Sequence, residues 1–530
     1  MSKNIPKILK NKWYLYLTEF FSGMSVMAVE LGASRLLAPY FSSSQIVWTI
    51  IIGTIMIAMA LGNIYGGKSA DKNPNPDKLY GRILIAGVWI ALIPFIGKLA
   101  ILGISALLVV TVSTNFLIWA AFLTCMIVFV YPLFLLGTVT PSLVKYTVDS
   151  LDDSGKTVGT LSAFNTIGSI IGTFVPTFIS IPAVGTAVTF LIFSAILLIL
   201  GIVYFISAKK SRLKSGISAA LFIVICFISP SLNFAFWEKD LAYEGESIYN
   251  YLQVKDNDYR TSLSTNVLFG VQSVYMKSSG LTGMYYDYAM AAPLMADNAN
   301  DILILGMGTG TYAKQCMEYF DGVSIEGVEI DSKITELAYE YFELPEEVKV
   351  ATYDGRAFLN VCDKKYDIIM VDAYQDITIP FQMSSVEFFA LVREHLNENG
   401  VMVVNMNMRS EENDSINSYL ADTIASQFSE VWTVDVGTST NRELFASNSS
   451  SMIERFREKA NALENPDLYA LMSRVNDGLV EYSAGDRILT DDKAPVELLG
   501  MSVIDDIIEE ELAYYKQRFA EDGIKGLIDG

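Results

Sequence analysis

Apolar stretches about twenty residues long fill the first half of the chain and limit what it can fold into. There are seven of them, at 14–34, 46–66, 82–97, 115–138, 158–180, 183–207 and 215–232. About 20 apolar residues are needed for a helix to cross a bilayer. We therefore expect residues 13–232 to form a helical membrane domain of about seven spans, with six or eight as alternatives. The lysine-containing start, 1–12, is expected to be a cytoplasmic tail.

Charge divides the chain at about the same place. Residues 1–237 hold 16 lysines and arginines against 7 acidic residues, a net charge of +9. Residues 238–530 hold 22 against 52, a net charge of −30. An acidic domain of this kind repels nucleic acid and attracts small cations. The expected partners are therefore the lipid bilayer for the first half and a small cationic ligand for the second.

Two features lie inside the predicted spans. Gly62 and Gly66, and likewise Gly168 and Gly172, are pairs of small residues four apart, which permit close helix packing. Glu30 is an acid within the first span, where a carboxylate is costly. It indicates either a site for a cation or a hydrogen bond to a neighbouring helix.

The second half changes from helical to strand patterns. Short alternating segments at 249–256, 261–270 and 271–279 predict a small antiparallel β domain over residues 233–282. Apolar β-rich segments separated by helical stretches then follow, at 301–306, 323–330, 348–354, 366–374 and 401–407. This alternation predicts a doubly wound parallel sheet, with the ligand beyond the carboxyl ends of the strands.

That sheet defines the remaining domains. Residues 283–450 are expected to form a Rossmann-like domain of the kind that binds S-adenosylmethionine. Residues 451–530 have a largely helical pattern and form a C-terminal extension. The extension is expected either to cover the active site or to make a contact in a homo-oligomer.

A glycine-rich turn follows the first strand of the predicted parallel sheet. Gly306, Gly308 and Gly310 alternate with other residues, and Thr309 lies between the last two. Such a turn brings backbone N–H groups and a helix N-terminus close to a ligand. A dinucleotide-binding turn would usually need glycine at Thr311, so the turn alone leaves the nucleotide open.

Acidic residues at the next two strand ends narrow the choice. Glu329 ends the second strand, where a carboxylate can accept both ribose hydroxyls. Asp354 and Gly355 end the third strand, where a carboxylate can accept from an adenine amino group. The third position favours an adenosyl-sulfonium ligand over a dinucleotide. A fold that has lost its ligand is the remaining alternative.

Two further acids follow the fourth strand. Asp372 and Asp376 are predicted to lie beside the sulfonium. Carboxylates there can hold a cationic amine, orient it and take its proton as it attacks carbon. His395, the single histidine, is expected on an exposed helix near its C-terminal end. No histidine or cysteine spacing indicates a metal site.

At these residues the chain resembles the polyamine aminopropyltransferases, or spermidine synthases, in the form fused to a membrane domain. The similarity runs from 244–254 to 403–407 and includes the segment GMYYDYAMAAPLM at 283–295. The segment LTDDKAPVE at 489–497 is similar to a signature of the membrane-fused group.

The resemblance implies a role for each matching residue. Glu329 corresponds to the ribose-binding acid, and Asp354 with Gly355 to the adenine-binding pair. Asp372 corresponds to the carboxylate that deprotonates the attacking amine. Tyr285 corresponds to a tyrosine that lines the amine site.

Several positions depart from the family pattern. Asn250 stands where many members have glutamine, and Tyr286 replaces a histidine or glutamine. Asp376 follows Asp372 by four residues rather than three. Thr309 replaces an aspartate that, in the family, contacts the aminopropyl ammonium of the donor. The sequence therefore supports recognition of the donor's adenosyl end better than recognition of its aminopropyl end.

The resemblance implies transfer of an aminopropyl group from decarboxylated S-adenosylmethionine to a diamine such as putrescine, with spermidine and methylthioadenosine as products. The donor is a co-substrate, and no permanently bound cofactor is expected. Two alternatives remain at this point: a methyltransferase that uses S-adenosylmethionine, and a polyamine transporter or sensor without catalytic activity.

The side of the membrane is a separate question. Basic clusters at 1–12, 66–82 and 209–214 can all face the cytoplasm if six spans lie before residue 209. A seventh span would place the acidic half outside the cell, where adenosyl donors are scarce. An interfacial segment at 215–232, or a hairpin at 82–113, would keep it inside. We expect a multi-pass cell-membrane protein with a cytoplasmic acidic half.

Overall fold

The chain forms two compact units, each described here by itself. The computed structural model describes residues 6–41, 44–112, 114–147, 154–229, 233–235, 238–267, 270–278, 280–374, 379–407, 409, 414–437 and 439–522. The first, called the helical unit, comprises Met1–Glu238, Gly245–Tyr251 and Glu511–Gly530. The second, called the sheet unit, comprises Lys239–Glu244 and Leu252–Glu510.

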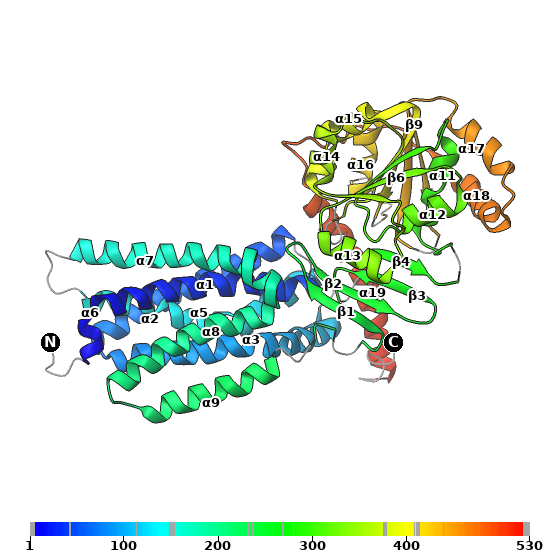
Figure 1. Ribbon diagram of the computed structural model, residues 1–530. Coiled ribbons are helices and arrows are strands. Elements are labelled where there is room, and N and C mark those ends of the chain that lie inside the picture. Colours follow the sequence, from blue (N-terminus) through cyan, green and yellow to red (C-terminus); the bar gives the residue numbers. More distant parts are fainter. Residues whose placement is uncertain are drawn as a thin grey trace. The chain divides into compact units, whose positions relative to one another are not determined.

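The helical unit contains the apolar first half of the chain, and its long helices lie alongside one another (Figure 1). In order, its elements are η1 Lys7–Lys10, α1 Lys12–Phe41, α2 Gln45–Lys72, α3 Pro76–Thr111, α4 Phe116–Val128, α5 Val130–Gly137, α6 Val139–Thr147, α7 Ser154–Val175, η2 Pro176–Ser180, α8 Ile181–Ser207 and α9 Arg212–Ile228. Helix α3 is continuous across the predicted stretch 82–97 and the apolar residues that follow it.

Length and composition single out four helical runs as able to cross a membrane. Within the described ranges these are Lys12–Phe41, Gln45–Lys72, Pro76–Val109 and Gly155–Ser207. A fifth candidate is the pair Phe116–Val128 and Val130–Thr147, which is bent by 48°. The run to Ser207 is interrupted at Gly185, whose φ of 78° and ψ of 169° are not helical. The count of seven spans stays a prediction.

Small residues permit the close helix packing that their spacing predicts. A Cβ atom at Gly168 would lie 2.0 Å from the carbonyl oxygen of Phe20 on α1. At Gly172 it would lie 2.1 Å from that of Met24, one turn further on. Gly62 is equally restricted by the backbone of α5. These helices therefore approach to distances that only glycine allows.

Two acids of α1 differ in their surroundings. Glu30, the acid noticed in the sequence, is half-buried. Glu19 is fully buried, and its Oε1 accepts hydrogen bonds from Thr140 (2.5 Å) and Asn165 (2.8 Å). Glu19, which the sequence analysis missed, thus makes hydrogen bonds to neighbouring helices, while both alternatives for Glu30 stay predictions.

A small antiparallel sheet precedes the parallel one. Its strands, in the order β1-β2-β3-β4, are β1 Leu241–Glu246, β2 Tyr251–Asp256, β3 Arg260–Ser264 and β4 Ser273–Met276. The three predicted strand segments correspond to β2, β3 and β4, and β1 is an additional strand. Leu263 of β3 lies opposite both Val254 and Ser273, which fixes the register.

The larger sheet has eight strands in the order β12-β10-β11-β9-β8-β5-β6-β7. They are β5 Asp301–Leu305, β6 Ser324–Glu329, β7 Lys349–Thr352, β8 Tyr366–Val371, β9 Leu396–Met406, β10 Glu430–Asp435, β11 Arg442–Ser447 and β12 Val480–Glu481. The five strands from β9 to β7 are parallel, as predicted. The antiparallel pair β10 and β11 continues the sheet beyond β9 and was not expected.

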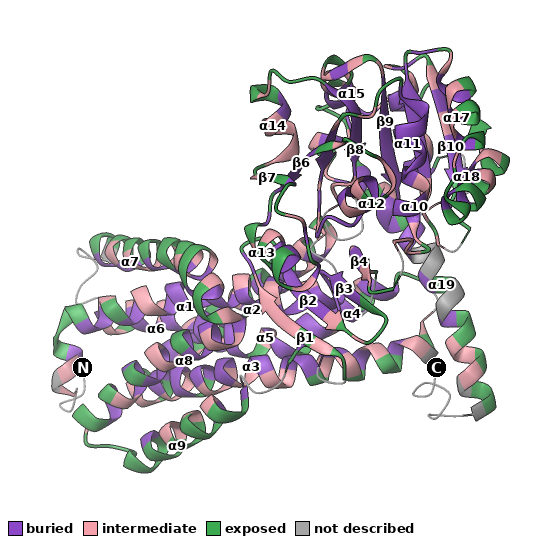
Figure 2. Cartoon of the chain, turned by 45° about the vertical axis from the view of Figure 1, so that its right-hand side comes forward, coloured by how far each residue is buried: buried purple, intermediate pink, exposed green. Residues whose placement is uncertain are grey.

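Helices cover this sheet, whose strands are largely buried (Figure 2). They are α10 Tyr285–Ala289, α11 Ala291–Met295, α12 Thr311–Tyr319, α13 Ser332–Tyr341, α14 Gly355–Val361, η4 Phe381–Met383, α15 Val386–Glu394, α16 Ile416–Ala425, α17 Met452–Asn461 and α18 Pro466–Gly478. The last helix, α19 Val496–Asp522, is not one of these, and its residues from Glu511 on belong to the helical unit. Between residues 451 and 522 the extension is helical apart from β12 and the connecting segments before α18 and α19.

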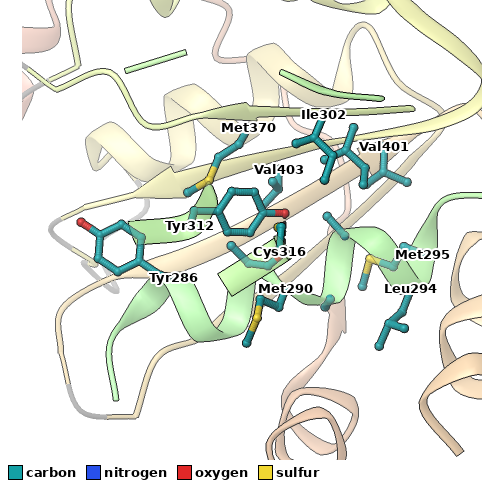
Figure 3. Packing of buried hydrophobic residues seen from close by; sticks show 14 of the residues in the cluster. Tyr286, Met290, Leu294, Met295, Ile302, Tyr312, Cys316, Met370, Val401 and Val403 are labelled. Carbon is teal, nitrogen blue, oxygen red and sulfur yellow. Dashed lines mark hydrogen bonds between the residues drawn. The ribbon is translucent and has the colours of Figure 1, made fainter. Parts of the chain in front are cut away.

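One face of the sheet packs against α10, α11 and α12. Met370 of β8 and Val403 of β9 point toward Tyr312 of α12 in this layer (Figure 3). Side chains alternate between the two faces of a strand, so the residues two positions further along point to the same side. These residues are Asp372, directly after β8, and Asn405 of β9. The apolar layer therefore ends in polar side chains at the carboxyl edge of the sheet.

Candidate active site

The turn after β5 requires glycine for two reasons. Gly306, Gly308 and Gly310 have φ of 82°, 58° and 83°, a region that other residues rarely adopt. A Cβ atom at Gly306 would also lie 2.5 Å from the carbonyl oxygen of Asp372. Gly310 is the N-cap of α12. The turn therefore brings its backbone against the end of β8 and starts a helix there.

Glu329, at the end of β6, holds this turn. Its Oε2 accepts a hydrogen bond from the backbone N–H of Gly308 (2.9 Å), and its Oε1 accepts from that of Asp331 (3.0 Å). Burial raises the pKa of Glu329 to about 7, against the lowering effect of these N–H groups. Two predicted co-substrate-binding features, the turn and the acid, are therefore in direct contact.

The third predicted feature starts a helix. Asp354 is the N-cap of α14 and accepts a hydrogen bond from the backbone N–H of Ala357 (2.8 Å). A Cβ atom at Gly355 would lie 3.1 Å from the terminal carbon of Met383, so space at this position is limited. The structure thus gives Asp354 a capping role, while its predicted contact with adenine stays a prediction.

The segment at 489–497 is hydrogen-bonded to helix α14, the helix that Asp354 caps. Asp491 accepts two hydrogen bonds from the guanidinium of Arg356, each of 2.7 Å, and a third from Ser385 (2.6 Å). The backbone N–H of Val386 bonds to the carbonyl of Leu489. The segment therefore links the first turn of α14 to the start of α15, next to the predicted adenine-binding pair.

Asp372, directly after β8, is held on both oxygens. Tyr285 donates to its Oδ2 (2.7 Å) and the side-chain amide of Asn405 donates to its Oδ1 (2.8 Å). Asn441 in turn donates to Asn405 Oδ1 (2.8 Å), which fixes the orientation of that amide. Desolvation of the carboxyl group raises the pKa of Asp372 to about 7, while the two hydrogen bonds lower it. The group can therefore exchange a proton near neutral pH.

Two tyrosines of α10 lie against one another beside this acid. The ring centroids of Tyr285 and Tyr286 are 3.9 Å apart. The hydroxyl of Tyr286 donates to the carbonyl of Gln272, whereas that of Tyr285 donates to Asp372. Burial raises the pKa of Tyr286 above its ordinary value, and the charge of Asp372 adds to this. Both hydroxyls stay protonated and act as donors.

Thr309 is buried within the turn. Its backbone N–H donates to Ser273 Oγ of β4 (3.1 Å), which ties the turn to the small sheet. Its own hydroxyl oxygen has no hydrogen-bond partner in the part of the chain that the structure describes. The position that departs from the family pattern therefore presents an unused hydroxyl rather than a charge.

For two predicted substrate-binding residues the structure gives no position relative to Asp372. Asp376 lies outside the described residues. Asn250 belongs to the helical unit, in the turn before β2, where its backbone N–H donates to Ser247 Oγ (2.9 Å). The predicted roles of both residues stay predictions.

Three polar residues of the site were missed in the sequence: Asn405, Asn441 and Glu443. Glu443 of β11 lies opposite Asn405 of β9 and is fully buried. Neither of its carboxylate oxygens has a hydrogen-bond partner among the residues described. The signal in the sequence is a polar side chain at an inward position of an otherwise apolar strand.

His395 takes no part in this site. It is the C-cap of α15, near the helix end as expected, but it is half-buried rather than exposed. Its ring nitrogens lie 2.8 Å from the carbonyl oxygens of Leu391 and Cys362. A search of the described residues found no group of three or more histidines, cysteines or acids that could hold a metal ion.

Comparisons with known proteins now assign the class. A family model described as the spermine/spermidine synthase domain matches residues 283–444. The probable polyamine aminopropyl transferase of Bifidobacterium longum is 56% identical over 344 residues, which cover 62% of this chain and 77% of that protein. The polyamine aminopropyltransferase of Vibrio vulnificus is 25% identical over 297 residues, covering 53% and 97%. The chain belongs to the polyamine aminopropyltransferase family, and it is an aminopropyltransferase.

Solved structures give a more distant likeness. A probable spermidine synthase from Corynebacterium glutamicum is 17% identical, with a TM-score of 0.36 over 47% of this chain and 99% of that one. The spermidine synthase from Thermotoga maritima is 18% identical, with a TM-score of 0.37 over 46% and 84%. The family is therefore assigned from the sequence relatives and not from the solved structures. Membership of this family favours aminopropyl transfer over the two alternatives left open by the sequence, a methyltransferase and a transporter or sensor.

Proposed function

We propose that the protein is a membrane-bound enzyme that transfers an aminopropyl group from decarboxylated S-adenosylmethionine to a diamine such as putrescine. The products would be spermidine and methylthioadenosine. The observation that carries this proposal is Asp372, a half-buried acid with a pKa of about 7, held between Tyr285 and Asn405 at a strand end. The family to which the chain belongs supports this proposal, and so does the net charge of −30 on residues 238–530, which attracts cationic substrates.

The proposed reaction needs a base and correct placement. The ionised carboxylate of Asp372 takes a proton from the terminal ammonium of the diamine, and the freed nitrogen attacks the methylene carbon next to the sulfonium. A nitrogen–carbon bond forms while the carbon–sulfur bond breaks, and its electron pair leaves with methylthioadenosine. The product nitrogen stays protonated as a secondary ammonium, and Asp372 releases the proton that it took to water, which regenerates the base. Tyr285 keeps the carboxylate oriented toward the amine.

The adenosyl end of the donor is proposed to lie against the strand ends β5 to β7. In this proposal Glu329 accepts from the ribose hydroxyls, and its contact with the turn at Gly308 supports that role. Asp354 and Gly355 would border the adenine. Burial in this region strengthens each hydrogen bond that the donor makes.

The membrane part of the proposal rests on the surface of the helical unit. Large apolar side chains are exposed on its outer helices, among them Met56 (66%) on α2, Phe174 (58%) on α7, Ile199 (60%) on α8 and Phe227 (79%) on α9. An exposed apolar surface of this extent is typical of lipid contact. We propose that the unit spans the cell membrane and that the acidic half faces the cytoplasm, where the donor is made.

Two experiments test these points. The purified full-length protein in detergent, given decarboxylated S-adenosylmethionine and putrescine, should release methylthioadenosine and spermidine. Absence of methylthioadenosine with every common diamine would overturn the proposed reaction. A cytoplasm-dependent reporter fused after residue 235 should be active, and activity of a reporter that works only outside the cell would overturn the proposed side.

A further inference from the structure

Glu443 is an unusual buried acid. It lies within β11, has none of its surface exposed, and neither carboxylate oxygen has a hydrogen-bond partner within the described ranges. Buried carboxylates are normally paired with a cation or with several donors, because desolvation without compensation is costly. Such a group in a folded protein therefore calls for a reason.

The register of the sheet places Glu443 at the amine site. It is opposite Asn405, and partners across antiparallel strands point to the same face. Asn405 is the residue whose side-chain amide binds Asp372. The two carboxyl groups are close enough to repel: desolvation and the charge of Asp372 raise the pKa of Glu443 well above its ordinary value. Glu443 is thus a second acid of the same buried site.

The neighbouring donors are already engaged. The hydroxyl of Tyr286 donates to a backbone carbonyl, and that of Tyr374 donates to the carbonyl of Asn405. The amide of Asn405 is used by Asp372. Burial raises the pKa of Tyr312, and the charge of Glu443 raises it further, so Tyr312 also lies near this acid. Among the described residues no cation donates a hydrogen bond to Glu443, and a primary ammonium group carries three donors.

We propose that Glu443 binds a primary ammonium group of the substrates that does not itself react. That group is either the far ammonium of the acceptor diamine or the aminopropyl ammonium of the donor, which share this chemistry. Asp372 then serves the reacting nitrogen, and Glu443 selects molecules that carry a further positive charge. This inference rests on the proposed aminopropyl transfer and assigns that site a specificity-determining residue.

Two variants and a control test the role. Glu443→Gln keeps the size of the side chain and removes its charge, and Glu443→Met also removes its polarity. Glu430→Gln, on the neighbouring strand β10 and outside the site, is the matched control. Turnover with putrescine and with the monoamine butylamine, and calorimetric binding of decarboxylated S-adenosylmethionine and of methylthioadenosine, are measured for each full-length protein.

The two sources of the ammonium give different results. If Glu443 binds the acceptor, both variants lose at least tenfold in kcat/KM for putrescine and little for butylamine, which has no second ammonium. If it binds the donor, they bind decarboxylated S-adenosylmethionine at least tenfold more weakly, while methylthioadenosine, which has no ammonium, binds unchanged. The melting temperature of the free variants should be unchanged or higher, since an unpaired buried acid has been removed.

Other results overturn the inference. If the wild-type protein turns over putrescine and both variants keep all four values within twofold, Glu443 has no such role while the proposed function stands. If both variants melt at lower temperature but bind both substrates normally, Glu443 is structural. If the wild-type protein releases no methylthioadenosine with any diamine, the proposed function fails, and unchanged calorimetric binding of both the donor and putrescine in the two variants would then reject Glu443 separately.

Discussion

Tyr285 donates its hydroxyl proton to Asp372 Oδ2 over 2.7 Å, and this bond joins the first turn of α10 to the end of β8. It stabilises the ionised carboxylate, so its removal should raise the pKa of Asp372 further. We expect Tyr285→Phe to lower kcat/KM by about tenfold to hundredfold, the usual value of a hydrogen bond to a charged group. The acidic limb of its pH–rate profile should move to higher pH.

Tyr288→Phe is the control for this variant. Tyr288 lies on the same short helix, and the loss of its hydroxyl should leave both kcat/KM and the pH profile unchanged. A Tyr285→Phe enzyme with a wild-type profile would show that the hydrogen bond to Asp372 does not affect its proton.

The pH dependence of the enzyme follows from Asp372. Its carboxylate must be ionised to take a proton, so kcat/KM should fall about tenfold for each pH unit below about 7. Glu443 and Tyr285 face it, and the repulsion from Glu443 acts in the same direction. A flat profile between pH 5 and 8 would contradict this assignment of the base.

Stability should depend on pH in the opposite sense. The pKa of Asp372 is raised from 3.8 to about 7 in the folded protein, so the folded state binds this proton more tightly than the unfolded state. Its contribution to stability is complete below 3.8 and is lost as the pH rises through about 7. The melting temperature of the wild-type protein relative to Asp372→Asn should therefore fall between pH 4 and 8.

Glu329 gives a prediction about the donor alone. Glu329→Gln removes the charge that is expected to bind the ribose hydroxyls, and one of its two contacts to backbone N–H groups. Methylthioadenosine should bind about tenfold to hundredfold more weakly by calorimetry. Glu326→Gln, on the same strand β6, serves as control because Glu326 bonds to Tyr366 instead. Equal affinities of the two variants would remove Glu329 from the donor site.

The glycine turn can be tested against a matched turn. An alanine held in the left-handed region of backbone conformation lowers the free energy of unfolding by about 1–2 kcal/mol, and this cost applies equally at Gly306 and at Gly322. At Gly322, with φ of 74°, an added Cβ meets nothing within 4 Å, whereas at Gly306 it meets the backbone of Asp372 at 2.5 Å. Gly306→Ala should therefore lower the melting temperature more than Gly322→Ala and should also reduce turnover. Equal melting temperatures would show that the turn has room for a side chain.

The parallel sheet could be predicted because each of its strands is a short apolar segment followed by a helical one. Glycine and acidic residues at the ends of those segments also identified Glu329 and Asp372, since parallel strands end at one edge. Glu443 and Asn405 could not be found in this way. They enter the site only because β11 returns antiparallel beside β9, and the order of strands in a sheet cannot be read from one chain.

Asp354 has a structural role that the sequence analysis did not name. An aspartate at the start of a helix can cap it, as Asp354 does for α14, while its predicted contact with adenine stays a prediction. In the helical unit, composition could not distinguish the two acids of α1. Glu19 finds partners on two other helices, Thr140 and Asn165, and those contacts depend on packing that no single stretch encodes.

If Glu443 binds the acceptor, the pair β10 and β11 lets the two substrates be recognised by separate parts of the chain. The residues predicted to bind the adenosyl group follow β5, β6 and β7, whereas Asn405 and Glu443 lie on β9 and β11, across the central strand β8. In that case an exchange of residues 430–447 between relatives would alter the choice of amine and leave the binding of the donor's adenosyl group unchanged. For protein engineering, this hairpin would then be a module through which one sulfonium donor could serve polyamines of different length.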